Sequence, residues 1–241
     1  MPLPDNINID KLIFSVLIDL KDAYNGWLGG VPRDEVTLMS RITERLSRNR
    51  QDCDVGVSYP VTMEAELFEL HRKGRRQVDK FGADLAVTVR IPDSNWLKTS
   101  FIQFKVASKK KTTLNSTQLR QSTQFPGLSE RSFVVVVDQE STAFHIKSTS
   151  RCLSAIHPSF ERKVFDVSRW QLLGPWLRRW FNCEEGKSSV ASDPNSVEAM
   201  LEEYVVISKT LDESKFLGAN FPKGGWPAKA WLDVSLIKPG G

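Results

Sequence analysis

Residues 82–111, GADLAVTVRIPDSNWLKTSFIQFKVASKKK, carry the clearest secondary-structure signal in the sequence. Segments 84–91 and 100–107 alternate apolar and polar residues and are rich in Val, Ile and Phe, a pattern typical of β-strands. The tetrapeptide PDSN at 92–95 consists of residues that favour turns. We therefore predict a β-hairpin whose two strands are antiparallel neighbours.

Polar residues interrupt both predicted strands. Asp84 begins the first strand, and Gln103 and Lys105 lie within the second. Because strand side chains alternate between the two faces of a sheet, Gln103 and Lys105 point to the same face. The apolar Ile102 and Phe104 point to the opposite face. A buried charge needs a partner, so the polar face is predicted to carry either an exposed Asp84–Lys105 ion pair or a functional site.

The same polar face suits a divalent-metal site. Mg²⁺ prefers oxygen ligands, typically one or two carboxylates together with waters and phosphate oxygens. Asp84 offers a carboxylate, Gln103 offers an amide oxygen, and Phe104 offers its main-chain carbonyl. Lys105 would hold or help to deprotonate an attacking water and offset charge that develops on a phosphate. The pattern indicates metal-assisted hydrolysis of a phosphate ester.

Segments on both sides of the hairpin indicate the fold class. Apolar residues recur at helical spacing in 10–24 and 34–46, and 114–125 is predicted to be a helix with a polar face. Segment 61–70 fits either an alternating strand or a short helix. The continuous apolar run at 133–138 is typical of a strand covered on both faces. This order predicts an α/β fold with a mixed central β-sheet flanked by helices.

The C-terminal part of the sequence has a different composition. A Trp-rich helix is predicted within 165–181, broken or started at Gly174, and 196–211 is predicted to be a helix that runs into a strand. We divide the chain into a core at 1–150, which includes the N-terminal helix, and a helical or mixed extension at 151–241 that packs on the core. Residues 186–196 are predicted to form a linker. Four aromatic side chains of the extension suit either core packing or base stacking: Trp170, Trp176, Trp180 and Phe181.

Composition narrows the class of protein. The chain has 241 residues, of which 40% are hydrophobic and 26% are charged, as in ordinary globular proteins. The longest apolar run of the first helix has seven residues, far short of the roughly 20 that a membrane helix requires, and no secretory signal is recognised. We expect a cytoplasmic protein without a membrane partner. Three cysteines, Cys53, Cys152 and Cys183, are too far apart in sequence for a zinc site.

Positive charge is concentrated around the hairpin. The chain has a net charge of +4, and the stretches 71–80 and 105–111 are both rich in Lys and Arg. Basic runs are often solvated loops. Beside a candidate phosphate-ester site, they favour contact with a polyanion such as nucleic acid.

The hairpin motif resembles a known family of nucleases. GAD at 82–84, followed after 18 residues by QFK at 103–105, is similar to the motif of the PD-(D/E)XK nuclease superfamily in its QxK variant. The family pattern also has a Glu on a helix before the hairpin, a helix after the Lys-bearing strand, and then a buried strand. Glu35, the 114–125 segment and the 133–138 segment occupy these places. The resemblance covers residues 34–138, and it lacks the Pro that commonly precedes the Asp.

The resemblance implies a role for each residue of the motif. Asp84 and Gln103 would bind the metal, Lys105 would activate the attacking water, and Glu35 would support the metal or its water. Three further acidic residues are alternatives to Glu35, which we prefer for its position at the start of a helix: Glu44, Glu64 and Glu66.

The resemblance further implies a restriction-endonuclease-like fold and the activity of a Mg²⁺-dependent endonuclease, with Mn²⁺ as a possible substitute. DNA is favoured over RNA as substrate, bacterial antiviral defence is the expected context, and a homodimer or a defence-system partner protein is compatible with it. The alternative is a non-catalytic module on the same fold that binds nucleic acid or serves in assembly. Seven side chains are predicted to contact nucleic acid: Arg75, Arg76, Lys109, Lys110, Lys111, Gln118 and Arg120.

Overall fold

The structure is a computed structural model. It describes ten segments of the chain: 7–30, 35–47, 62–69, 83–91, 96–123, 128–186, 188–190, 197–199, 201–202 and 228–237.

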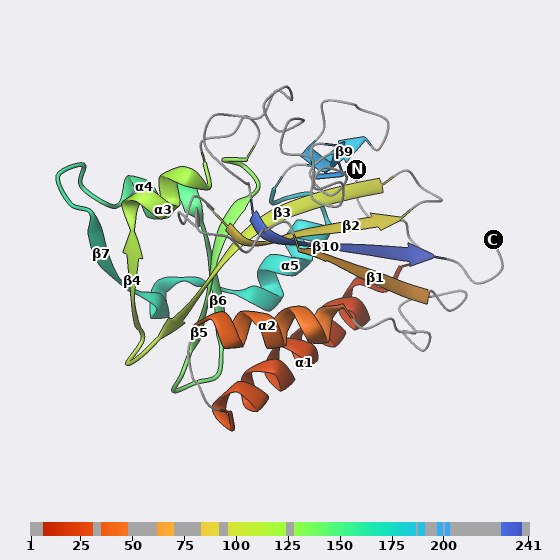
Figure 1. Ribbon diagram of the computed structural model, residues 1–241, viewed down its shortest axis with the longest axis horizontal. Coiled ribbons are helices and arrows are strands. Elements are labelled where there is room, and N and C mark those ends of the chain that lie inside the picture. Colours follow the sequence, from red (N-terminus) through yellow and green to blue (C-terminus); the bar gives the residue numbers. More distant parts are fainter. Residues whose placement is uncertain are drawn as a thin grey trace.

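An eight-stranded mixed sheet runs through the middle of the molecule (Figure 1). Its strand order is β1-β10-β2-β3-β5-β6-β8, and β9 pairs with β3 beside this path. The pairs β10–β2 and β3–β5 are parallel and the others are antiparallel. The strands have the bounds β1 Thr62–Glu69, β2 Ala83–Ile91, β3 Trp96–Ala107, β5 Ser132–Asp138, β6 Phe144–Ser148, β8 Gln171–Leu172, β9 Ser188–Val190 and β10 Ala228–Ile237.

The predicted hairpin is confirmed as the antiparallel pair β2–β3. Leu85 lies opposite Ile102, and Thr88 lies opposite Thr99. The hydroxyl groups of Thr88 and Thr99 hydrogen-bond at 2.7 Å, and the indole N–H of Trp231 on β10 donates to Thr88 Oγ1 at 2.9 Å. The polar atoms of this buried row therefore satisfy one another, which ties three neighbouring strands together.

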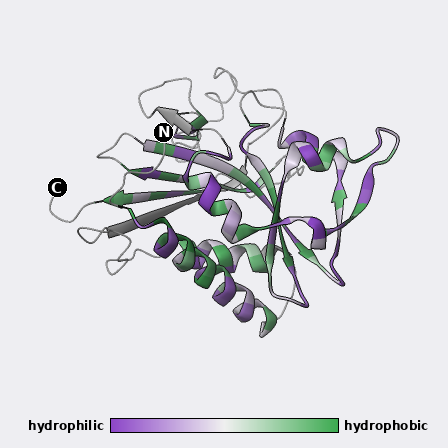
Figure 2. Ribbon diagram, turned by 180° about the vertical axis from the view of Figure 1, so that it is seen from behind, coloured by the Kyte–Doolittle hydropathy of each residue, from purple (hydrophilic) through white to green (hydrophobic). Residues whose placement is uncertain are grey.

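One face of the sheet is covered by three helices, α1 (Ile9–Leu28), α2 (Glu35–Leu46) and α5 (Leu173–Phe181). Figure 1 shows α1 and α2 lying together on one side of the strands, with α5 beside them. Their buried side chains join Leu85, Phe104 and other residues of the sheet in one hydrophobic cluster. In Figure 2, hydrophilic and hydrophobic residues alternate along α1 and α2, as expected of helices with one buried face.

The other face is covered by smaller elements: α3 (Ser116–Gln121), α4 (Thr149–Ser154), and a two-stranded sheet of β4 (Lys111–Asn115) and β7 (Arg162–Asp166). They pack on Val134 and Val136 of β5 in a second hydrophobic cluster. All residues of β5 are buried, because helices or strands cover it on both faces. The α/β architecture with a mixed central sheet flanked by helices is therefore confirmed.

Several elements differ from their sequence predictions. The segment 61–70, which fitted a strand or a helix, contains strand β1. The helix predicted at 114–125 starts at Ser116, because Asn115 ends β4 and caps α3 by accepting hydrogen bonds from two backbone N–H groups. The helix predicted within 165–181 starts only at Leu173, beside Gly174 and Pro175, since the preceding residues form β7 and a 3₁₀ turn.

The C-terminal residues contribute strands to the central sheet. β10 lies between β1 and β2, so a segment from the end of the sequence separates two strands from its first half (Figure 1). β9 falls within the predicted linker at 186–196 and pairs with residues 96–98 of β3. The linker prediction is wrong for these residues. Among the helices that the structure describes, none combines the length and the apolar composition that a membrane-spanning helix requires.

A fully buried lysine links β3 to α5. The Lys98 ammonium donates to the main-chain carbonyl of Trp180 and lies 5.0 Å from the centre of the Trp180 ring. The indole N–H of Trp180 donates to Ser100 Oγ at 2.7 Å. Burial is the largest influence on this amine and lowers the pKa of Lys98 from 10.5 to about 8.

The lowered pKa of Lys98 predicts a pH-dependent contribution to stability. The unfolded chain keeps this proton up to about pH 10.5, whereas the folded protein releases it above about pH 8. The free energy of unfolding due to Lys98 therefore rises between these two pH values, by about 1.4 kcal/mol for each pH unit. Urea unfolding of wild type and Lys98→Met at pH 7, 8, 9 and 10 measures the difference. Parallel pH profiles for the two proteins would contradict the prediction.

Candidate active site

The hairpin brings three of the predicted site residues together on one face of the sheet. Because Leu85 lies opposite Ile102, the residues next to them, Asp84 and Gln103, are cross-strand neighbours. Cross-strand neighbours in an antiparallel pair point to the same face. Lys105 follows two residues after Gln103 on β3 and shares that face. This face is the one that α3 and α4 cover.

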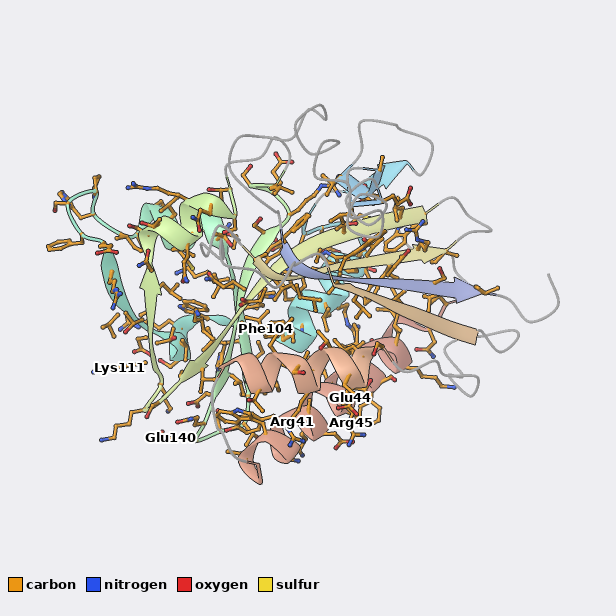
Figure 3. The ribbon with its side chains drawn as sticks, viewed as in Figure 1. Arg41, Glu44, Arg45, Phe104, Lys111 and Glu140 are labelled. Carbon is orange, nitrogen blue, oxygen red and sulfur yellow. The ribbon has the colours of Figure 1, made fainter. Side chains whose placement is uncertain are left out.

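Main-chain contact with β3 fixes the Asp84 carboxylate. Asp84 Oδ2 accepts a hydrogen bond from the backbone N–H of Phe104 at 2.9 Å. The Phe104 ring itself points to the opposite face and is buried in the cluster with α1 and α5 (Figure 3). Hydrogen bonds to a carboxylate are stronger than those between neutral groups. The strand backbone therefore orients the Asp84 carboxylate near the start of β2.

Gln103 presents a buried oxygen. Its amide N–H₂ donates to Gln118 Oε1 on α3 at 3.1 Å, and only 6% of the residue is exposed. Within the described part of the chain, Gln103 Oε1 is buried and has no hydrogen-bond partner. An unsatisfied buried acceptor costs about 1–3 kcal/mol. Such a cost is offset when a cation or an ordered water binds the oxygen, so the donor set of this face fits a hard metal ion.

The structure describes the backbone of Glu35, the predicted acidic residue on the helix, but not its side chain. α2 begins at Glu35, whose side chain lies outside the described structure. The buried residues Leu38 and Ile42 pack α2 into the cluster on the face opposite Asp84. Glu44, on the same helix, is exposed (Figure 3). The role of Glu35 therefore stays a prediction.

The register of β1 against β10 shows where two alternatives to Glu35 lie in the sheet. Glu64 lies opposite Ser235 and Glu66 lies opposite Asp233 on β10. Through β10, these two positions are level with Arg90 and Thr88 of β2. Thr88 is four residues from Asp84 along the strand, which corresponds to about 13 Å of backbone. Among the described side chains, no group of three or more His, Cys, Asp or Glu could hold a metal ion.

The predicted basic residues lie around the site at different distances. Lys109 and Lys110 form the tight turn between β3 and β4, with φ of 52° and 57°, and Ser108 and Lys111 exchange backbone hydrogen bonds of 3.0 Å across it. These lysines are exposed and extend beyond the end of β3, where Figure 3 labels Lys111. Lys110 is five residues from Lys105, so the turn is more than about 10 Å from the site.

Of the other residues predicted to contact nucleic acid, two lie on α3 and two lie outside the described residues. Gln118 touches Gln103 directly, and Arg120 is exposed on the same short helix. Arg75 and Arg76 lie outside the described residues. α3 is therefore the element that borders Gln103, and Arg120 is the charged residue of this helix.

His145 shares the face of Lys105 and was not a sequence-based candidate. Lys105 pairs with Val136 on β5, and Val136 pairs with His145 on β6, so the three lie in one row. Two strand spacings separate Lys105 from His145, about 10 Å of backbone. A solitary His in the segment FHIKS carries no motif, so only the register identifies it. The separation leaves His145 outside the direct reach of Asp84.

Asp138 at the end of β5 has a structural role. Asp138 Oδ2 accepts hydrogen bonds from the hydroxyl of Ser141 at 2.5 Å and from its backbone N–H at 3.3 Å, which closes the β5–β6 turn. Burial raises the pKa of this carboxyl, but these hydrogen bonds and the nearby His145 outweigh burial and lower the pKa below its usual value. Asp138 therefore stays ionised as part of the turn.

No protein-family model matches the chain, and no curated protein matches its sequence. The functional interpretation therefore depends on the geometry of the site and on the motif.

Proposed function

We propose that the protein is a Mg²⁺-dependent nuclease that hydrolyses phosphodiester bonds at Asp84, Gln103 and Lys105. The observation that carries the proposal is the pairing of an anchored carboxylate with a buried, unsatisfied oxygen. Asp84 is fixed on the β3 backbone, and its cross-strand neighbour Gln103 offers Oε1 without a partner among the described residues. An amine of Lys105 on the same face completes the set needed for attack at phosphorus.

Each residue has a defined task in this proposal. Asp84 and Gln103 Oε1 would bind Mg²⁺, with Gln118 holding the Gln103 amide so that Oε1 faces the ion. Bound Mg²⁺ polarises the phosphate and lowers the pKa of its water. Lys105 would orient the attacking water and offset the negative charge that develops on the phosphate oxygens.

The substrate class follows from charge and from the motif. Exposed Arg120 on α3 and the exposed turn at 109–111 supply positive charge for a phosphate backbone. The similarity of GAD–QFK to PD-(D/E)XK nucleases extends the proposal to a restriction-endonuclease-like core, to DNA as substrate, and to a cytoplasmic role in bacterial antiviral defence. A homodimer or a defence-system partner protein would let two sites address two strands.

Metal removal tests the proposed function directly. Purified protein is incubated with supercoiled plasmid, single-stranded DNA and RNA in the presence of Mg²⁺, Mn²⁺ or EDTA. We expect nicked or linear DNA with either metal and no cleavage with EDTA, because binding of the scissile phosphate and activation of water both require the ion. Gel electrophoresis measures the products. A protein that is inert on all three substrates with both metals would contradict the proposal.

Gln118 is expected to act as a positioning residue. Gln118→Ala removes the acceptor of the Gln103 amide, so the metal affinity and the cleavage rate should each fall about 10-fold or more, as with other residues that orient metal ligands. Gln118→Glu retains an acceptor oxygen and should restore most of the Mg²⁺ affinity. The Mg²⁺ concentration for half-maximal cleavage is the readout. Gln139→Ala, which changes an exposed Gln in the β5–β6 turn, is the matched control.

A non-catalytic nucleic-acid-binding module is the second candidate. The observation in its favour is that, among the described side chains, no group of three or more His, Cys, Asp or Glu that could hold a metal ion accompanies Asp84. Isothermal titration with Mn²⁺ separates the two functions. A nuclease should take up Mn²⁺ in an Asp84-dependent manner, whereas the binding module should bind DNA without Mn²⁺ uptake.

A further inference from the structure

A second polar pocket lies at the edge of the sheet, away from Asp84. Its volume is about 510 Å³, and its walls include Lys147 and Ser148 of β6, Arg151 of α4, and Trp170. The pocket forms where strand pairing stops. β8 pairs only with His145 and Ile146 of β6. Within the described structure, Lys147 and Ser148 have no strand on that side, so the edge of β6 opens into the pocket.

The pocket carries an excess of positive charge. Lys147, Arg151 and Arg169 line it together with the acidic Glu130 and Glu185. Glu185 is already paired with Arg179 at 3.0 Å. Neither Arg151 nor Arg169, both exposed, forms an ion pair with any carboxylate in the described segments. The charge of Arg169 acts on the exposed Asp166 carboxylate and contributes to its lowered pKa, but the two groups form no ion pair. The pocket is thus lined by two guanidinium groups and an ammonium that can face an anion.

Aromatic side chains form another wall of the same pocket. Trp170 and Trp176 both line it, although each is largely buried in the protein. The Lys147 ammonium lies 5.7 Å from the centre of the Trp170 ring, which holds this cation at the wall. The two indoles give the pocket an apolar wall against which a planar ring can lie. A cavity of this size lies within the range of about 300–1,000 Å³ typical of small-molecule sites.

We propose that this pocket binds a small phosphate monoester that carries an aromatic ring, the chemistry of a nucleotide. Guanidinium groups bind phosphate through paired hydrogen bonds, so Arg151 and Arg169 would hold the phosphate. The ring would lie against Trp170 and Trp176. The hydroxyl of Ser148 accepts a hydrogen bond from the backbone N–H of Arg151 at 3.4 Å, which fixes the backbone that carries the Arg151 side chain.

The pocket is separate from the proposed active site. Gln103 pairs with Val134 on β5, and Val134 pairs with Lys147, so two strand spacings lie between Gln103 and the pocket wall. The second hydrophobic cluster, which contains Val134, Val136 and Trp170, fills the space between them. A ligand in the pocket therefore does not contact Asp84, and its binding is independent of cleavage at that site.

Tryptophan fluorescence of the full-length protein tests the proposal, because two indoles line the pocket. The probes are AMP, inorganic phosphate, adenosine, and a 5′-phosphorylated dinucleotide. We expect saturable quenching by AMP, with at least 10-fold weaker binding of adenosine, which lacks the phosphate, and of inorganic phosphate, which lacks the ring. A dinucleotide that binds more tightly than AMP would identify a nucleic-acid end as the source of the phosphate monoester, and weaker binding would identify a free nucleotide.

Two variants complete the test. Arg151→Ala combined with Arg169→Ala removes two exposed cations, and AMP affinity should fall at least 10-fold with unchanged circular dichroism. Arg178→Ala removes a different exposed cation, one that pairs with Asp10 on α1, and AMP affinity should be unchanged. Absence of saturable quenching at millimolar AMP, or equal affinity of the double variant and wild type, would overturn the proposal. Both readouts are independent of nuclease activity.

Discussion

Asp84→Asn is expected to abolish phosphodiester cleavage, with a loss of about 10³-fold or more in rate, the scale seen when one preorganised charged group leaves an active site. The substitution keeps the shape of the side chain, and Asn Oδ1 can still accept from the Phe104 N–H that holds Asp84 Oδ2 at 2.9 Å. It removes the negative charge that would bind Mg²⁺. Plasmid nicking under single-turnover conditions measures the rate.

Three further measurements make the Asp84 result specific. Mn²⁺ titration of Asp84→Asn should show lost metal uptake, and thermal unfolding should show a melting temperature close to that of wild type. Asp22→Asn, an exposed residue of α1 whose carboxylate lies 3.8 Å from Arg45, is the matched control and should cut normally. An Asp84→Asn protein that cleaves at the wild-type rate would refute the assignment of this site.

Glu198→Ala is expected to give the largest loss of stability, about 3–5 kcal/mol, because it removes the carboxylate that is hydrogen-bonded to the buried Arg131 guanidinium. Arg131 Nη1 lies 3.2 Å from Glu198 Oε1, and both side chains are about 95% buried or more. Arg131 immediately precedes β5, and its carbonyl accepts from the N–H of Phe101 on β3 at 2.8 Å. Loss of this ion pair therefore disturbs the strand pair next to Gln103.

Urea denaturation at pH 7 measures the stability of Glu198→Ala. The double variant Arg131→Met with Glu198→Leu removes both charges and should recover much of the loss, since replacing a buried ion pair with apolar residues is often neutral. Glu202→Ala is a control for the same short helical segment, because Glu202 is exposed and its ion pair with Arg90, at 3.5 Å, lies at the surface. A loss below 1 kcal/mol for Glu198→Ala would show that the ion pair is not energetically isolated from water.

Local periodicity was sufficient to predict the centre of the fold. Alternation in 84–91 and 100–107 predicted β2 and β3 and the face that each side chain takes. The apolar run at 133–138 predicted that β5 is covered on both faces. These signals succeed because side-chain direction in a strand depends only on neighbouring residues. Consequently, the convergence of Asp84, Gln103 and Lys105 on one face was also predictable.

Contacts between distant segments were not predictable in this way. The position of β10 between β1 and β2 depends on pairing across more than a hundred residues, which no local pattern encodes. The alternating apolar residues of AWLDVSLI could have indicated a strand, but not its neighbours. The anchoring of Asp84 by the Phe104 N–H and the contact of Gln118 with Gln103 likewise depend on register and on helix placement.

The location of β10 has a consequence for how the protein is made. During translation, β1 and β2 emerge from the ribosome long before the strand that will lie between them, and each then has an unpaired edge. Pairing of β10 with β2, the strand that carries Asp84, must wait for residues 228–237. A nascent chain thus reaches its final arrangement around Asp84 only after residues 228–237 have been synthesised, and until then the unpaired edges of the incomplete sheet favour binding of chaperones.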